Sequence, residues 1–220
     1  MGRPRTNDEV VKERLVECAT EMLATRPRES VTVRAVAAAA EASTTAVYSL
    51  FGGKDGLIGA VRDKAVAGLF QDLSAVQTSA ADPLADLYAL AVAYRRWGRG
   101  HSHLYTVLFG GVQPFAPSGE VGASDPIRPL LAAIDRALTA SVLAGDATSI
   151  ALSMWATMHG LVTLELAGAL DATTAEAAFR STIHATLRGW TTPEVFRSVR
   201  QAELARRQDQ DRYPHSADLG

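Results

Sequence analysis

Apolar side chains recur every three or four residues along most of the chain, which is the spacing of amphipathic helices. The first such stretch runs from about Asn7 to Thr25 and ends before Pro27. Its apolar positions are Val11, Leu15, Cys18, Ala19, Met22 and Leu23. No stretch shows the strict alternation that a half-buried strand requires. The predicted fold class is therefore all-α.

Two short helices with a tight turn between them follow the first helix. Thr32 is suited to cap a helix from Val33 to Ala40, because its hydroxyl can accept a hydrogen bond from a free backbone N–H. Glu41-Ala42-Ser43 forms the turn, and a second short helix runs from about Thr44 to Phe51. Gly52-Gly53 ends it, since glycine accepts the left-handed conformation that terminates helices.

Longer helices make up the rest of the chain. One extends from about Leu57 to Leu73, and Pro83 begins another that Gly98 and Gly100 interrupt. The remaining predicted helices are His101–Phe109, Leu130–Leu143, Ala147–Leu170, Thr174–Trp190 and a short one near Glu194–Arg206 in the charged tail. The segment from Val112 to Pro129 is rich in proline, glycine and serine and is the one long loop.

The first turn of the helix at Thr44 to Phe51 is polar, and base edges are read from this turn of a recognition helix. Tyr48 lies one turn further on, where its ring can lie along the sugar–phosphate backbone. Hydroxyls at the turn can reach phosphates or bases. The predicted DNA-binding residues are Arg3, Arg5, Thr32, Arg34, Ser43, Thr44, Thr45, Tyr48 and Lys54.

The charged members of this set surround the recognition helix. Lys54 opens the next helix, where its ammonium and the free backbone N–H groups would both face a phosphate. Thr32 and Arg34 can hold the backbone in the same way, and Arg3 and Arg5 form a short arm suited to the minor groove. The alternative is that the two short helices merely pack together, but the coincidence of these features argues against it.

Composition limits the other function classes. The 220-residue chain carries a formal net charge of −2, so any attraction for nucleic acid must be local rather than global. Its single cysteine, Cys18, cannot form an internal disulfide, and the N-terminus lacks an apolar signal-peptide core, so a cytoplasmic location is expected. The apolar stretch Ile150–Leu170 contains His159 and Glu165 and lacks basic anchors, so we interpret it as a buried helix rather than a membrane span.

Catalytic motifs are missing from the sequence. Gly52-Gly53-Lys54-Asp55 superficially resembles a phosphate-binding loop, but Tyr48 occupies the first glycine position and Asp55 replaces serine or threonine. There is no metalloprotease, nucleophile-elbow or dinucleotide fingerprint in the sequence. We therefore predict neither an enzyme nor a cofactor.

The helix-turn-helix stretch resembles the tetracycline-repressor (TetR) family of regulators over about the first 65 residues. The matching positions are Thr32, Ala37, Ala40, Ser43, Tyr48, Phe51, Lys54 and Leu57. Glu41 departs from the family pattern, which usually places glycine at this turn, and a left-handed glutamate costs roughly 1 kcal/mol. The resemblance implies an all-α homodimer whose head binds a palindromic operator.

A second, shorter resemblance lies in the body. Trp155-Ala156-Thr157-Met158-His159-Gly160 is similar to the C-terminal domain of a TetR branch that carries a Trp-His-Gly motif. Trp155 and His159 share a helix face, and aromatic residues with a few polar tips suit an apolar small molecule. The candidate ligand-binding residues are Trp97, His101, Tyr105, Phe109, Trp155, Met158 and His159. The alternative is that these are ordinary core residues and that His159 bonds a backbone carbonyl.

Two further groups of residues carry no predicted site. His101-Ser102-His103 supplies two imidazoles without a third ligand at useful local spacing, so no metal is predicted. Arg95, Arg96 and Arg99 are interpreted as a solvated face rather than a second nucleic-acid site.

The domain prediction assigns 1–55 to a helix-turn-helix DNA-binding head, 56–192 to a helical ligand-binding and dimerisation body, and 193–220 to a charged tail. The last two long helices are the predicted dimer interface, because small residues there permit close approach. These residues are Ala177, Ala178, Ser181 and Ala185. The predicted function is a ligand-responsive dimeric repressor, released from double-stranded operator DNA by a small apolar molecule. The competing hypothesis is a helical ligand- or partner-binding protein without operator binding.

Overall fold

The computed structural model describes residues 5–78, 82–109, 125–198 and 200–201, and side chains from Asp8 onward. Over these residues the chain is helical, and its one β contact is an isolated bridge between Leu143 and Thr191. The prediction of an all-α fold is confirmed. The helices are α1 (Arg5–Thr25), α2 (Val33–Ala39), α3 (Thr44–Phe51), α4 (Lys54–Ser74), α5 (Pro83–Gly100), α6 (Ser102–Phe109), α7 (Arg128–Thr139), α8 (Ala147–Leu166) and α9 (Ala172–Trp190).

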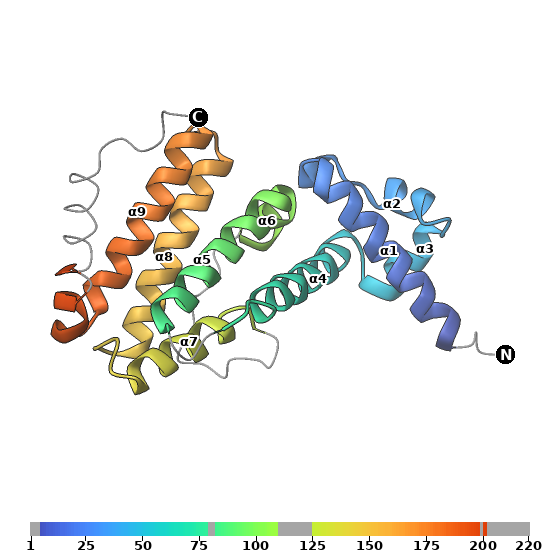
Figure 1. Cartoon of the computed structure of the whole chain (residues 1–220). Helices are drawn as coiled ribbons and strands as arrows, with labels where there is room; N and C mark the ends of the chain where they lie inside the picture. The colour runs from blue at the N-terminus through green and yellow to red at the C-terminus, as the bar shows by residue number, and fades with distance from the viewer. Residues whose placement is uncertain (1–4, 79–81, 110–124, 199, 202–220) are drawn as a thin grey trace, which may run out of the picture.

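Helices α1, α2 and α3 form a compact head at one end of the molecule (Figure 1). Leu15, Val36 and Val47, one from each helix, are completely buried together in its core. Arg14 ties α1 to the turn after α2, because its Nη2 donates a hydrogen bond of 2.7 Å to the carbonyl oxygen of Ala40. The orientation of α3 is therefore fixed by packing and by a polar bond to the turn before it.

The turn between α2 and α3 adopts the conformation that a glycine would normally supply. Glu41 has a φ of 49°. Its N–H bonds the carbonyl of Ala38, and the N–H of Ala42 bonds the carbonyl of Ala37 at 2.8 Å. This pair of bonds is the Schellman arrangement that ends a helix with a left-handed residue. A glutamate thus adopts here the left-handed conformation for which glycine is the usual residue.

The body joins the head through α4, the long helix that runs from one to the other in Figure 1. Helix α6 packs against both α1 and α4, and α5 packs against α4, α7 and α8. Helices α8 and α9 lie side by side at the far end, antiparallel because a short turn joins them (Figure 1). No helix in the described ranges is long and apolar enough to cross a membrane.

Several body helices begin or end elsewhere than predicted. Helix α5 continues through Gly98 to Gly100. Gly98 lies where α5 meets α8, and a Cβ there would be 2.8 Å from Val162, so this glycine permits close packing and does not end the helix. Helix α7 starts earlier and stops at Thr139, since Ser141 takes a left-handed φ of 55°. Helix α8 ends at Leu166 rather than at residue 170, before a left-handed glycine.

The last helices differ less from the prediction. Asp171 caps α9 by accepting hydrogen bonds of 3.0 Å from the N–H groups of Thr173 and Thr174, so the helix begins two residues early. In the charged tail, residues 193–198 and 200–201 are helical. The remainder of the predicted tail helix and most of the predicted loop lie outside the described residues.

Candidate nucleic-acid interface and effector site

The predicted reading face of α3 is on the surface. Ser43, Thr44 and Thr45 are exposed at its first turn, and the Tyr48 side chain one turn later is 60% exposed. Ser43 also caps the helix, because its Oγ accepts a hydrogen bond of 3.1 Å from the N–H of Ala46. The Ser43 hydroxyl proton stays available, so the residue can cap the helix and donate outward at the same time.

Two glycines after α3 shape the surface next to this face. Gly52 is left-handed with a φ of 73° and closes α3. Gly53 has a φ of 126°, and a Cβ there would lie 3.4 Å from the ring of Tyr48. The Tyr48 ring therefore rests beside the backbone of Gly53.

Lys54 and the start of α2 flank the reading face. The Lys54 ammonium donates a hydrogen bond of 3.1 Å to the carbonyl of Arg28, which leaves two N–H groups for a phosphate. Thr32 accepts from the N–H of Ala35 at 3.2 Å and is exposed, as is Arg34. Sequence reasoning missed Arg28, whose carbonyl positions Lys54 across 26 residues of chain.

The predicted N-terminal arm is only partly covered by the structure. Arg3 lies outside the described residues. Arg5 is the first residue of α1, and its side chain also lies outside the described part. The roles assigned to Arg3 and Arg5 stay predictions.

Four of the predicted ligand-binding residues come together in the body. The imidazole of His159 stacks on Trp155, with ring centroids 5.0 Å apart and planes 5° from parallel. Phe109 meets the same imidazole edge-on at 4.8 Å, and the Tyr105 hydroxyl lies 2.6 Å from His159 Nδ1. Helices α6 and α8 are thus joined by an aromatic cluster with one imidazole at its centre.

Tyr94 completes this cluster, although it was not among the candidate ligand-binding residues. Its hydroxyl lies 3.2 Å from both the Tyr105 hydroxyl and His159 Nδ1. The three polar tips therefore form a closed triangle that links α5, α6 and α8. A tyrosine at a predicted buried position could have indicated such a site, since a buried hydroxyl needs a hydrogen-bond partner.

The other three predicted residues lie apart from this triangle. Trp97 is buried and stacks on His101 at 5.2 Å. The His101 Nδ1 bonds the carbonyl of Trp97 at 3.0 Å. The alternative that His159 bonds a backbone carbonyl is wrong for its Nδ1, which contacts two tyrosine hydroxyls instead. Met158 is buried on the same face of α8 as Met154 and Val162, whereas His159 lies on a neighbouring face of the helix.

Burial controls the protonation of the triangle. It raises the pKa of the Tyr94 and Tyr105 hydroxyls, so both are donors near neutral pH. It lowers the pKa of His159, so the imidazole is neutral there. The cluster is thus an uncharged hydrogen-bonding unit within aromatic surroundings.

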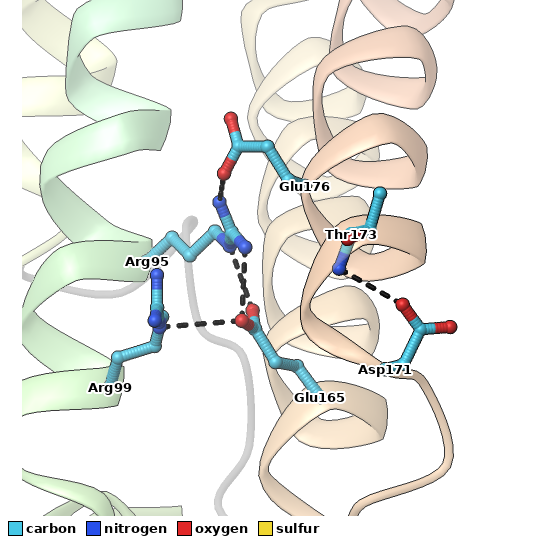
Figure 2. A network of polar contacts seen from close by, with 6 residues as sticks. All are labelled: Arg95, Arg99, Glu165, Asp171, Thr173 and Glu176. Atoms are coloured by element: carbon cyan, nitrogen blue, oxygen red, sulfur yellow. Dashed lines mark hydrogen bonds and ion pairs between the residues drawn. The ribbon is translucent and has the colours of Figure 1, made fainter.

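The interpretation of Arg95 as part of a solvated face is wrong. Its side chain is only 9% exposed and makes a bidentate ion pair with Glu165, with contacts of 2.7 and 2.9 Å. Arg95 also pairs with Glu176, and Arg99 contacts Glu165 at 3.3 Å (Figure 2). Arg96 is exposed as expected. The network joins α5 to the end of α8 and the start of α9.

Comparisons with known proteins agree with this arrangement. A family model described as bacterial regulatory proteins of the tetR family matches residues 15–61. A second, described as a tetracyclin repressor-like C-terminal domain, matches residues 87–186. A helix-turn-helix (HTH)-type transcriptional regulator of Mycobacterium tuberculosis, Rv0681, itself uncharacterized, is 27% identical over 192 residues, covering 81% of this chain and 84% of the relative.

Solved structures show the same fold. A protein of unknown function from Rhodococcus sp. RHA1 superposes with a TM-score of 0.68 at 22% identity, covering 83% of this chain and 96% of that one. A TetR-family transcriptional regulator from Pectobacterium atrosepticum gives a TM-score of 0.63 at 19% identity, covering 86% and 98%. These likenesses concern the fold alone.

The fold and the two matched segments define a class of protein, the bacterial transcriptional regulators that read DNA through a helix-turn-helix head. Within that class the chain belongs to the TetR family, whose two characteristic domains match in order along it. TetR-family members bind DNA operators and small-molecule effectors and work as dimers. The predictions of a regulator and of a protein other than an enzyme are confirmed by these matches.

Proposed function

We propose that the protein is a dimeric repressor that leaves a palindromic operator when a small apolar molecule binds its body. The observation that carries this proposal is the exposed polar turn of α3, with Ser43, Thr44, Thr45 and Tyr48 facing outward. Its domains would be a DNA-binding head over 1–55, a body over 56–192 and a tail over 193–220. Thr32, Arg34 and Lys54 would hold the phosphates beside the recognition helix. Arg3 and Arg5 would serve as the arm.

The dimer would form through α8 and α9. Leu152 and Leu164 are large exposed apolar residues on α8, and Ala156 and Gly160 between them are small and exposed. On α9 the exposed small residues are Ala177, Ser181 and Ala185, with Ala178 half-buried. Two copies packed through these faces would make a four-helix bundle and would set the two heads about one DNA turn apart, or a multiple of it.

The effector would bind at the aromatic cluster around His159. The Trp155 and His159-Gly160 positions support assigning the body to the Trp-His-Gly branch of the family. Helix α6 carries Tyr105 into that cluster and packs against α1 of the head, so a ligand that prefers one position of α6 would shift the head. The shift can be no larger than the ligand's differential affinity for the two states.

A mobility-shift titration with DNA from upstream of its own gene tests operator binding. Tyr48→Ala should weaken specific binding by about 1–3 kcal/mol, the range for a lost base or backbone-positioning contact. Lys54→Ala should reduce the dependence of log K on log salt by about two for a dimer, because each protomer would release one phosphate contact. Selective binding to none of several upstream fragments at moderate salt would contradict the proposal.

Lys64→Ala is the matched control for Lys54→Ala. Lys64 lies on the same helix, half-exposed and 3.7 Å from Glu17, ten residues and so about 15 Å from Lys54. The Lys64→Ala substitution removes the same charge as Lys54→Ala, but at a position away from the reading face. It should leave the dependence of log K on log salt unchanged. If neither Tyr48→Ala nor Lys54→Ala alters any DNA affinity, the alternative of a helical binding protein without operator function gains support.

A further inference from the structure

His159 uses only one of its two ring nitrogens within the described protein. Nδ1 contacts the hydroxyls of Tyr94 and Tyr105, whereas Nε2 makes no hydrogen bond to any residue in the described ranges. In that part of the chain no buried side-chain nitrogen or oxygen lacks a partner. Nε2 therefore keeps some contact with solvent, and its hydrogen-bonding position is not taken by a residue of the described part of the chain.

The geometry of the triangle decides which nitrogen of the neutral ring carries the proton. The contact of 2.6 Å between the Tyr105 hydroxyl and Nδ1 is short for an N–H donor, for which about 2.7–3.2 Å is usual, and normal for an O–H donor. Tyr105 therefore donates to Nδ1 rather than to the His159 carbonyl oxygen, which lies farther away at 3.3 Å, and the Tyr94 hydroxyl donates to the oxygen of Tyr105 at 3.2 Å. The imidazole proton is then on Nε2, which makes that nitrogen a donor.

The surroundings of the imidazole are apolar and electrically balanced. Trp155 covers a face of the ring and Phe109 meets it edge-on. The nearby cations on α5 that point toward α8, Arg95 and Arg99, are already paired with Glu165 and Glu176. A carboxylate buried here would lose its hydration without gaining an unpaired cation, which is costly.

We propose that Nε2–H of His159 is the hydrogen-bond donor that recognises the effector, and that the effector is an uncharged molecule with a carbonyl or ether oxygen on an apolar ring system. The rings of Trp155 and Phe109 contact the apolar part, and Nε2 donates to the oxygen. Tyr105 and Tyr94 hold the imidazole in the tautomer that donates. This assignment deepens the proposed function and rests on the body being an effector site.

The tautomer can be measured directly without any ligand. Side-chain ¹⁵N spectra of the full chain at pH 7.5, assigned by comparison with His159→Gln, should show for His159 an unprotonated Nδ1 and a protonated Nε2. Tyr105→Phe should shift the population toward the other tautomer, because it removes the hydroxyl that donates to Nδ1. A His159 that carries its proton on Nδ1 in the natural chain overturns the assignment.

Ligand preference is tested by equilibrium dialysis with three probes of one ring system: 2-acetylnaphthalene, 2-naphthoate and 2-methylnaphthalene. The ketone should bind about twofold to twelvefold more tightly than the hydrocarbon, the range for one net hydrogen bond. His159→Phe should abolish this ratio, and His159→Gln, which keeps an amide donor, should retain part of it. His184→Phe is the control, because that imidazole stacks on Tyr88 elsewhere and the ratio should not change.

Other outcomes overturn the inference. They are equal binding of all three probes, tightest binding of the carboxylate, binding of none, or a ratio that survives His159→Phe in a variant with unchanged thermal unfolding. The mobility-shift titration separates this failure from failure of the proposed function. Operator binding with no probe preference removes only the effector assignment, whereas probe preference without operator binding removes only the repressor proposal.

Discussion

Replacing Arg95 by methionine tests whether the ion network of Figure 2 holds the body together. Arg95 is the shared partner of two carboxylates from different helices. The Arg95 and Glu165 side chains are only 9% and 12% exposed, so water cannot fully replace either partner. Methionine has a similar length and no charge, so the change leaves Glu165 short of its main partner while preserving most of the packing.

The size of the effect follows from what the carboxylates retain. Removing one partner of a buried ion pair costs about 3–5 kcal/mol. Two features reduce this cost here. Arg99 stays 3.3 Å from Glu165, and Glu176, whose side chain is 60% exposed, regains hydration. We expect a loss of about 3 kcal/mol in the free energy of unfolding. For a chain of this size that corresponds to a melting temperature lower by roughly 6–12 °C.

Thermal unfolding at one fixed protein concentration measures the change, since a dimer's stability depends on concentration. Arg96→Met is the matched control: the same substitution one residue along α5, at an exposed side chain, should alter stability by less than about 0.5 kcal/mol. Adding Glu165→Leu to Arg95→Met should restore part of the loss, because no buried carboxylate then lacks its partner. A double variant no more stable than Arg95→Met would show that packing, not charge, sets the cost.

Three further predictions concern backbone and pH. Gly98→Ala should destabilise the protein by about 1–3 kcal/mol in urea unfolding, because its Cβ meets Val162 at 2.8 Å, whereas Gly100→Ala meets no atom within 4 Å and should be neutral or stabilising. Glu41→Gly should stabilise the head by up to about 1 kcal/mol by relieving the left-handed strain, and an unchanged or lower unfolding midpoint would refute this. The hydrogen bond from Arg95 lowers the pKa of Glu176 in the folded protein below its unfolded value of about 4.3. The stabilisation that this bond gives the folded state is therefore present above the unfolded pKa and is lost as the pH falls through the folded pKa. Glu176→Gln should therefore flatten the decline in stability between pH 6 and pH 3.

The head was predictable because its signals are local. Ser43 accepts from an N–H three residues on, and Gly52 takes its left-handed φ immediately after the helix, so both bounds of α3 could be obtained from neighbouring residues. The exposure of Tyr48 followed from helical periodicity alone. Such features depend on nothing distant in the chain. The strained Glu41 is the exception, since tertiary packing and the Arg14 bond to Ala40 hold a conformation that its side chain disfavours.

The body was less predictable because its polar contacts are long-range. Arg95 bonds carboxylates that lie 70 and 81 residues away, so no local pattern separates it from exposed Arg96. Local spacing did place Trp155 and His159 on one face correctly. The same helical geometry separates Met158 from His159, because one residue changes the direction by about 100°, and Met158 is buried in the core.

The two polar networks of the body act on the same pair of helices. Tyr94 and Arg95 are adjacent on α5. Tyr94 is linked to His159 through the Tyr105 hydroxyl, and Arg95 bonds Glu165, which lies six residues after His159 on α8, about 9 Å along its axis. A helix held at two points on different faces cannot rotate about its axis without breaking one of them. Rotation of α8 relative to α5 would therefore cost at least one of these polar contacts. Helix α6 contacts α8 through Tyr105 and Phe109 and packs on α1 and α4, so we expect it to be the body helix that carries a displacement to the head.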